Sequence, residues 1–305
     1  MVELNCSAIP PFNFLSVVHS HGWYQLAPFL FEDEPALETI VRVRSGIVLP
    51  VRMVPVEGGV ALRAGLEIGE ADRRDLCDQV AWMLDLERDF SEFYQLADRE
   101  PKLQQARTRA QGRLLRSPTI FEDVVKTILT TNTSWAGTKR MVSALVELYG
   151  DSPVGVAEKL SDADPARKAF PTPQRLSETS EEELREKARL GYRAPFVYEL
   201  AKKAASGELA LEALKHHRMP ADQLHKFLLG IKGVGGYAAA HLLLLLGQYD
   251  YIPVDSWARK LVSVEWFAGE GIGDKEVKDK FETWGNWKAL AFWLWDWEYI
   301  HLSQE

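Results

Sequence analysis

The chain has 305 residues, of which 46% are hydrophobic and 26% charged, as is typical of a globular protein with a sizeable core. Cys6 and Cys77 are its only cysteines, which excludes a disulfide framework and a four-thiolate iron–sulfur cluster. The first residues lack the basic start and apolar run of a signal peptide, and the longest apolar run, 237–247, is too short to cross a membrane. We therefore expect an intracellular protein without a membrane partner.

The net charge of −8 argues, taken alone, against a nucleic-acid partner. Its distribution weakens that argument. Residues 101–117 contain five basic side chains and no acidic one, and residues 215–260 contain six basic and three acidic side chains. Because a local basic surface on an acidic protein can still bind phosphates, the charge permits DNA binding without requiring it.

The first hundred residues predict a small α+β domain. Strand character, including a Gly-Gly hairpin in the last segment, occurs at 38–44, 47–56 and 56–62. Two amphipathic helix patterns follow, at 70–86 and 91–99. The rest of the chain, 101–305, is expected to be a helical domain.

In this second part, helix patterns cover 117–129, 134–149 and 194–206. The stretch 151–180 is rich in Pro, Ser and Asp and is expected to be a long connection, which a capping box at 180–183 ends. The tail 284–300 carries five tryptophans, and we favour a helix that packs them into the core over a role in stacking on bases. These are Trp284, Trp287, Trp293, Trp295 and Trp297.

A glycine-rich turn joins two further helix patterns, 220–229 and 237–246. Gly233, Gly235 and Gly236 let the backbone turn tightly and approach another group closely. The N–H groups at the start of the second helix favour a phosphate.

A single carboxylate follows this hairpin at a fixed distance. Asp255 lies eighteen residues after Tyr237, behind a loop that contains Gly247 and Pro253, and it begins the helix pattern 256–264. An aspartate at a helix start is usually only an N-cap. Its place after a phosphate-binding hairpin makes a functional role the better interpretation.

Hairpin, loop and aspartate together resemble the helix-hairpin-helix (HhH-GPD) DNA glycosylase superfamily, whose hairpin reads roughly Leu-Pro-Gly-Val-Gly. Residues 115–132 also resemble that family's long helix and following turn, and Gly191-Tyr-Arg-Ala-Pro-Phe-Val197 resembles its Gly-Tyr-Arg-Ala segment. The matches keep the family's order over about 113–264.

The resemblance is nearest to the 3-methyladenine DNA glycosylase II and 8-oxoguanine glycosylase branches, which carry an N-terminal sheet domain. It implies a mainly α fold: an α+β domain with a small antiparallel sheet at 1–100, and a helical glycosylase core at 101–305. The helix-hairpin-helix would span about 220–247.

The resemblance further implies a base excision repair enzyme that flips a damaged base out of double-stranded DNA and cleaves its N-glycosidic bond. Asp255 is then the catalytic carboxylate, which opposes the positive charge of the sugar or activates a water. Tyr237 stands where the branch that also nicks the backbone has a lysine. Since tyrosine cannot form a Schiff base, we expect a monofunctional enzyme. Its expected substrate is a damaged purine, with an alkylated purine as the favoured choice.

Two alternatives stay open. One is a bifunctional 8-oxoguanine-type glycosylase/lyase that uses a displaced lysine, for which Lys232 and Lys260 are near enough in sequence. The other is a non-catalytic protein that binds DNA structures, against which the intact Pro253-Val254-Asp255 argues.

The remaining expectations concern binding. Lys232 and the three hairpin glycines would hold a DNA phosphate, with a monovalent cation bridging backbone carbonyls as in the family. Asn132 would fill the gap left by the flipped nucleotide, or else serve as a turn or cap residue. Together with Tyr237, the aromatic residues Trp23 and Tyr24 would line the base pocket, although core packing is the commoner role of such aromatics. We expect a monomer with no other cofactor and no metal, because His19 and His21 lack further ligands.

Overall fold

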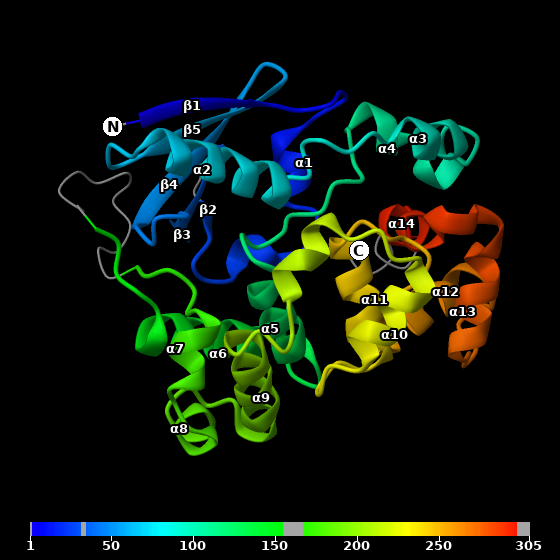
Figure 1. Ribbon diagram of the computed structural model, residues 1–305. Coiled ribbons are helices and arrows are strands. Elements are labelled where there is room, and N and C mark those ends of the chain that lie inside the picture. Colours follow the sequence, from blue (N-terminus) through cyan, green and yellow to red (C-terminus); the bar gives the residue numbers. More distant parts are fainter. Residues whose placement is uncertain (1, 32–34, 155–166, 298–305) are drawn as a thin grey trace. The chain divides into compact units, whose positions relative to one another are not determined.

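The computed structural model describes residues 2–31, 35–154 and 167–297 of the chain. It forms two compact units, each built from two stretches of sequence. The first unit comprises 1–88 and 113–217, and the second comprises 89–112 and 218–305. In the described part, no helix has both the length and the apolar character that crossing a membrane would need. The expected mainly α fold with a small antiparallel sheet near the N-terminus is confirmed (Figure 1).

The sheet belongs to the first unit and has the strand order β1-β5-β4-β3-β2, with every pair antiparallel. Its strands are β1 (Val2–Ser7), β2 (Leu30–Phe31), β3 (Leu37–Arg42), β4 (Val48–Val56) and β5 (Gly59–Ala64). The predicted hairpin is present: Val56 pairs with Gly59, and Gly58 in the turn has φ +72°. Strand β1 was not predicted; among the described strands it pairs with β5, almost sixty residues away.

The helices of the first unit are α1 (Phe14–Val18), α2 (Glu70–Met83), α5 (Ile120–Thr130), α6 (Trp135–Tyr149), α7 (Pro173–Ser177), α8 (Glu181–Glu186) and α9 (Ala194–Ala205). Short 3-10 turns occur at η1 (Gly22–Gln25), η3 (Gly191–Arg193) and η4 (Leu211–His216). At the start of α8, Ser180 accepts from the Glu183 N–H as predicted, but the Glu183 carboxylate pairs with Lys187, so the capping box is only half formed.

The structure of the stretch 151–180 differs from the predicted connection in one respect. In the structure this stretch contains the short helix α7, which the Thr172 hydroxyl caps. The helix begins at Pro173, a residue suited to the first helical position. Residues 155–166 of this connection lie outside the described part.

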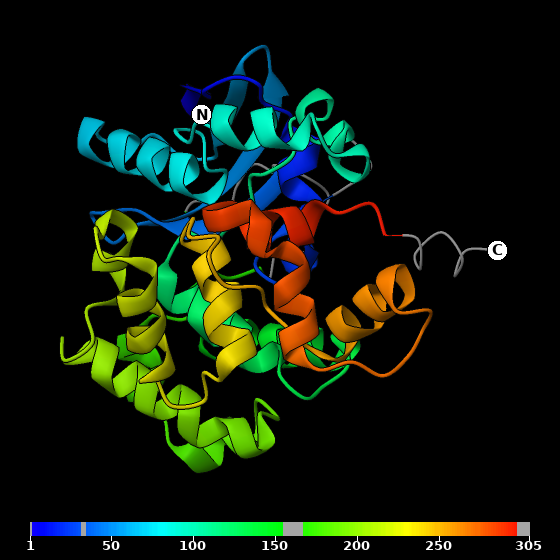
Figure 2. The same ribbon diagram turned by 90° about the vertical axis from the view of Figure 1, so that its right-hand side faces the viewer.

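The second unit consists of α3 (Ser91–Ala97), η2 (Pro101–Leu103), α4 (Gln105–Thr108), α10 (Ala221–Leu229), α11 (Gly236–Leu245), α12 (Ser256–Trp266), α13 (Asp274–Phe281), η5 (Glu282–Trp287) and α14 (Lys288–Leu294). Helix α13 was not predicted, because its sequence is mostly charged and only Val277 and Phe281 are buried, one turn apart. In Figure 2 the yellow pair α10 and α11 precedes the orange helices along the chain.

Aromatic side chains of the tail pack against other rings of the second unit, although of the five tail tryptophans only Trp297 is buried and the other four are half-buried. Trp295 lies 5.3 Å from Phe281 between ring centroids, and Trp297, which is buried, lies 5.2 Å from Phe292. Trp287 stacks on Tyr249 at 5.3 Å. Residues 298–300 of the predicted tail lie outside the described part.

Candidate active site

The hairpin of the second unit has the predicted form. Helices α10 and α11 pack together, and the turn between them is closed by the Ile231 N–H to the Leu228 carbonyl and the Val234 N–H to the Ile231 carbonyl, both at 3.0 Å. Gly233 has φ +89°, in the left-handed region that glycine tolerates best. Ile231 and Val234 are buried and anchor the turn in the unit.

The start of α11 is suited to bind an anion. Gly235 is its N-cap, and no side chain of the described residues caps this end. Gly235 and Gly236 are both exposed, and the space beyond their α-carbons is open. Lys232 is exposed in the same turn. First-turn N–H groups and the positive end of the helix dipole therefore face a space that a phosphate could enter.

Asp255 is both a helix cap and part of a cavity. It is the N-cap of α12, and its Oδ1 accepts a hydrogen bond from the Ala258 N–H at 2.8 Å. The ordinary structural role of such an aspartate is therefore fulfilled. The side chain is only half-buried and also lines a cavity of about 240 Å³. The cap uses one carboxylate oxygen, and Oδ2 has no hydrogen bond within the described chain.

The walls of this cavity are mainly aromatic. They are formed by Tyr237, Pro253, Asp255, Trp257, Ala258, Leu261, Phe292, Trp293 and Trp297. Tyr237 lies near enough to Asp255 to respond to its charge: burial, and secondly the Asp255 carboxylate, raise the pKa of Tyr237 to about 12. The phenol therefore keeps its proton at neutral pH. Trp257, 51% exposed, lies at the rim.

No described residue that lines this cavity is a lysine. Lys232 and Lys260, the two amines that the sequence leaves open, are both exposed on the second unit and are not among the lining residues. An amine that forms a Schiff base has to reach the sugar carbon.

Sequence reasoning did not single out His241, one turn after Tyr237 on α11. Its ring is nearly parallel to that of Tyr237 at 6.2 Å, and it lies 5.8 Å from Trp293. The side chain is 5% exposed, and burial lowers its pKa to about 4, so the imidazole is neutral at physiological pH. The helical spacing of four residues from Tyr237 was the signal that could have identified it.

In the first unit, Asn132 lies in the turn after α5. It is exposed and has φ +49°, while Ser134 caps the next helix, so Asn132 is a turn residue rather than a cap. Its Nδ2 lies 3.4 Å from the hydroxyl of Tyr192, which is 51% exposed. The Arg193 guanidinium stacks over Tyr192 at 4.4 Å and donates to the Thr131 carbonyl. Asn132 thus forms one exposed polar and aromatic group with a residue of the Gly-Tyr-Arg-Ala segment.

Trp23 and Tyr24 also belong to the first unit. Trp23 is 2% exposed, and its Nε1 donates to Asp123 Oδ1 at 2.8 Å. Tyr24 is half-buried and packs edge-on against His19 at 4.8 Å. These contacts favour core packing for Trp23, whereas Tyr237 and Asp255 share a cavity in the second unit. His21 forms a hydrogen bond with the Leu115 carbonyl through Nε2 and packs edge-on against Trp23, as His19 does against Tyr24.

Known proteins resemble this chain in sequence and in fold. Residues 125–286 match the family described as HhH-GPD superfamily base excision DNA repair protein. The DNA-3-methyladenine glycosylase of Bacillus subtilis (strain 168) is 24% identical over 230 residues, which are 73% of this chain and 72% of that protein.

Two solved structures share the fold. The 3-methyladenine DNA glycosylase of Archaeoglobus fulgidus superposes with a TM-score of 0.74 at 21% identity, covering 96% of this chain and 97% of that one. The 8-oxoguanine glycosylase/lyase of Clostridium acetobutylicum, in complex with double-stranded DNA containing cytosine opposite 8-oxoguanine, gives 0.64 at 21% identity, with 92% and 100% covered.

The family match covers more than half of the chain and includes the hairpin and Asp255. The chain therefore belongs to the HhH-GPD superfamily of base excision DNA repair proteins. The expectation of a base excision DNA glycosylase is confirmed at the level of the family.

Proposed function

We propose that this protein is a monofunctional DNA glycosylase that hydrolyses the N-glycosidic bond of an alkylated purine in double-stranded DNA. One observation carries the proposal: Asp255 and Tyr237 line the same aromatic cavity, and no described lining residue is a lysine. The name of the Bacillus subtilis relative, a DNA-3-methyladenine glycosylase, supports the same substrate class.

Asp255 would supply the chemistry. As the base departs, the sugar gains oxocarbenium character, and a carboxylate beside it stabilises that charge or accepts a proton from an attacking water. The Oδ1 hydrogen bond to the Ala258 N–H holds the carboxylate in place, while Oδ2 is left for the sugar or the water. Hydrolysis by water leaves an intact abasic strand.

The aromatic walls would select the base. A purine alkylated on a ring nitrogen is electron-poor or cationic, and the electron-rich faces of tryptophan and tyrosine attract such a ring. Trp293, Trp297 and Tyr237 offer these faces. The Tyr237 phenol, which stays protonated, can also donate a hydrogen bond.

The other predicted residues would bind the DNA. The α11 N-terminus and Lys232 would hold a backbone phosphate, which gives affinity without sequence preference. A monovalent cation at the hairpin would strengthen that contact. Asn132 would enter the gap in the duplex, and we add Tyr192 to this role, because it is exposed and in hydrogen-bonding contact with Asn132.

A panel of duplexes tests the proposal, each with one damaged base and each assayed with and without borohydride. Excision of an alkylated purine that leaves an alkali-labile site, with no trapped complex, is the expected result. A covalent complex trapped on abasic DNA would instead support the glycosylase/lyase alternative. The absence of excision from every duplex would favour the non-catalytic alternative.

A further inference from the structure

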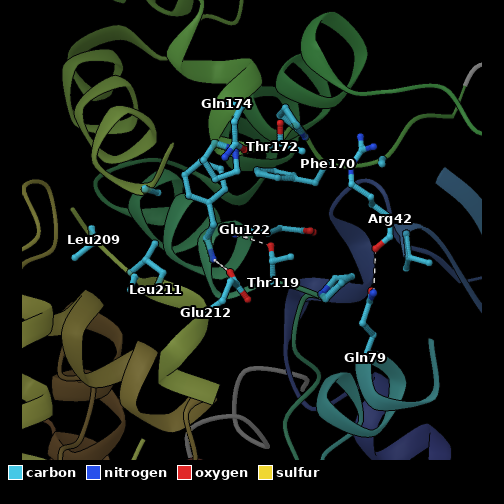
Figure 3. A pocket seen from close by; sticks show the side chains of 18 of the residues that line it. Arg42, Gln79, Thr119, Glu122, Phe170, Thr172, Gln174, Leu209, Leu211 and Glu212 are labelled. Carbon is cyan, nitrogen blue, oxygen red and sulfur yellow. Dashed lines mark hydrogen bonds between the residues drawn. The ribbon is translucent and has the colours of Figure 1, made fainter. Parts of the chain in front are cut away.

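A second cavity lies within the first unit, and its lining residues are not among those that the proposed function uses. It measures about 400 Å³, which falls in the range of about 300–1,000 Å³ usual for small-molecule sites. Its walls come from β3, α2, the start of α5, the segment 169–174, the end of α9 and the segment 209–213 (Figure 3). Asp255 and Tyr237 belong to the second unit.

The body of this cavity is apolar and in part aromatic. Phe121 and Phe170 form adjacent walls in an edge-to-face arrangement, with ring centroids 6.4 Å apart and an angle of 68° between the ring planes. Leu209 and Leu211 line another side (Figure 3). A flat apolar group is the shape and chemistry that such walls accommodate.

Hydrogen bonds between distant segments hold these walls in place. The Glu212 carboxylate accepts from the Ile120 and Phe121 N–H groups at 3.2 and 3.1 Å, which fixes the 209–213 segment against the start of α5. On the other side, Gln79 Nε2 donates to the Arg42 carbonyl at 3.0 Å. A cavity whose walls are fixed in this way is preformed.

Every charged side chain that lines the cavity already has an opposite charge within the first unit. The charged lining residues are Glu122, Glu212 and Arg42. Glu122 pairs with the buried Lys126 at 2.5 Å, and Glu212 pairs with Lys215 at 3.1 Å. Arg42 pairs with Asp151. A charged ligand would therefore leave water without finding a free counter-charge, which is costly.

Neutral polar groups, in contrast, remain available at the edges. The Gln174 side chain is exposed and makes no hydrogen bond within the described chain. Gln79 uses its Nε2 for two hydrogen bonds, which leaves its Oε1 as an acceptor. We propose that this cavity binds an uncharged ligand with a flat aromatic body and an amide-like hydrogen-bonding group.

Three probes with one aromatic body but different charge test the proposal: indole-3-acetamide, the indole-3-acetate anion and the tryptamine cation. Binding is measured by calorimetry on the full chain. The amide is expected to bind, and both charged probes are expected to bind at least about tenfold more weakly, because neither finds a free partner. Equal affinity for all three, or no binding of the amide, would overturn the proposal.

Two neighbouring alanines give a matched pair of variants. Ala204 lines the cavity and Ala205, the next residue of α9, does not, and both are half-buried. Ala204→Phe should weaken amide binding at least about tenfold and Ala205→Phe should leave it unchanged. Gln174→Ala, at an exposed site that keeps the fold, should weaken it as well. Equal binding by all of these variants would refute the site.

The aromatic cavity of the second unit could bind indole too, so its contribution is measured separately. Trp257→Ala changes that cavity alone and should leave the affinity for the amide as it is. Loss of binding in Trp257→Ala, with retention in Ala204→Phe, would assign the probe to the other cavity and overturn the proposal. Ala204→Phe is expected to keep its glycosylase activity, so this outcome is independent of the proposed function.

Discussion

The buried carboxylate of Asp123 gives the stability of the first unit a pH dependence that a single substitution should remove. Asp123 lies on α5, where its Oδ1 accepts from Trp23 Nε1 at 2.8 Å and from the Ser117 N–H at 3.0 Å. Burial raises its pKa from 3.8 to about 6, against the lowering effect of the hydrogen bonds from Trp23 and Ser117.

The magnitude follows from the size of this rise. A shift of one pKa unit corresponds to about 1.36 kcal/mol, so the rise in the pKa of Asp123 from 3.8 to about 6 corresponds to about 3 kcal/mol. The folded state binds the proton more tightly than the unfolded state does. The stabilisation that this tighter proton binding gives is therefore complete below pH 3.8 and is lost as the pH rises through about 6. About 2 kcal/mol of the loss falls between about pH 4.5 and about pH 8.

Asp123→Asn keeps the acceptor for Trp23 and Ser117 but cannot ionise. Its amide nitrogen replaces Oδ2, a buried atom without a hydrogen-bond partner in the described chain, and this costs about 1–3 kcal/mol at every pH. The test is therefore the change with pH, measured by urea unfolding. The difference in stability between wild type and variant should shift by about 2 kcal/mol, in favour of the variant, from about pH 4.5 to about pH 8.

Asp85 provides a control of opposite sign. It is also buried, but Arg116 and Arg88, at 3.1 and 2.8 Å, outweigh the effect of burial and lower its pKa. Its stabilising effect is therefore present above its ordinary pKa of 3.8 and is lost at lower pH. Asp85→Asn should lose stability at neutral pH. A pH-independent difference between wild type and Asp123→Asn would refute the reasoning for Asp123.

Three further predictions concern DNA. Gly235→Asp should weaken binding to damaged and undamaged duplexes alike, by about tenfold in a gel-shift titration, because it adds a negative charge where the phosphate binds. The space beyond the Gly235 α-carbon is open, so the variant should fold. An unchanged affinity would then show that the hairpin is only a turn. Tyr237→Lys should give some borohydride-trapped complex on abasic DNA, since it puts an amine beside Asp255, and a complete lack of trapping would contradict the hairpin geometry. Tyr192→Ala should slow excision by about tenfold, as stacking on a base is worth about 1–3 kcal/mol, and an unchanged rate would remove Tyr192 from the site.

The local parts of the fold could be predicted from the sequence. Helices α10 and α11 begin and end within about a residue or two of their predicted limits, because periodic apolar residues and the glycines of the turn determine them locally. Asp255 was likewise placed at a helix start by its immediate neighbours. Strand β1 could not be found in this way, because it depends on pairing with a distant strand.

The walls of the candidate site depend on long-range contacts, which spacing does not reveal. Trp293 and Trp297 were expected in the core, and nothing local indicates that they also line the cavity with Asp255. The contact of Asn132 with Tyr192 joins residues sixty positions apart. The hydrogen bond between Trp23 and Asp123, which favours core packing for Trp23, joins residues one hundred positions apart.

The most direct test of the central claim is single-turnover excision of an alkylated purine from a duplex by wild type and by Asp255→Asn, with borohydride added in parallel. Wild type should release the base and leave an uncut strand with no trapped complex. Asp255→Asn should bind abasic-site DNA at least as tightly but release no base, because it removes the charge and keeps the bulk. Full activity of Asp255→Asn, or a covalent complex trapped with wild type, would contradict the account.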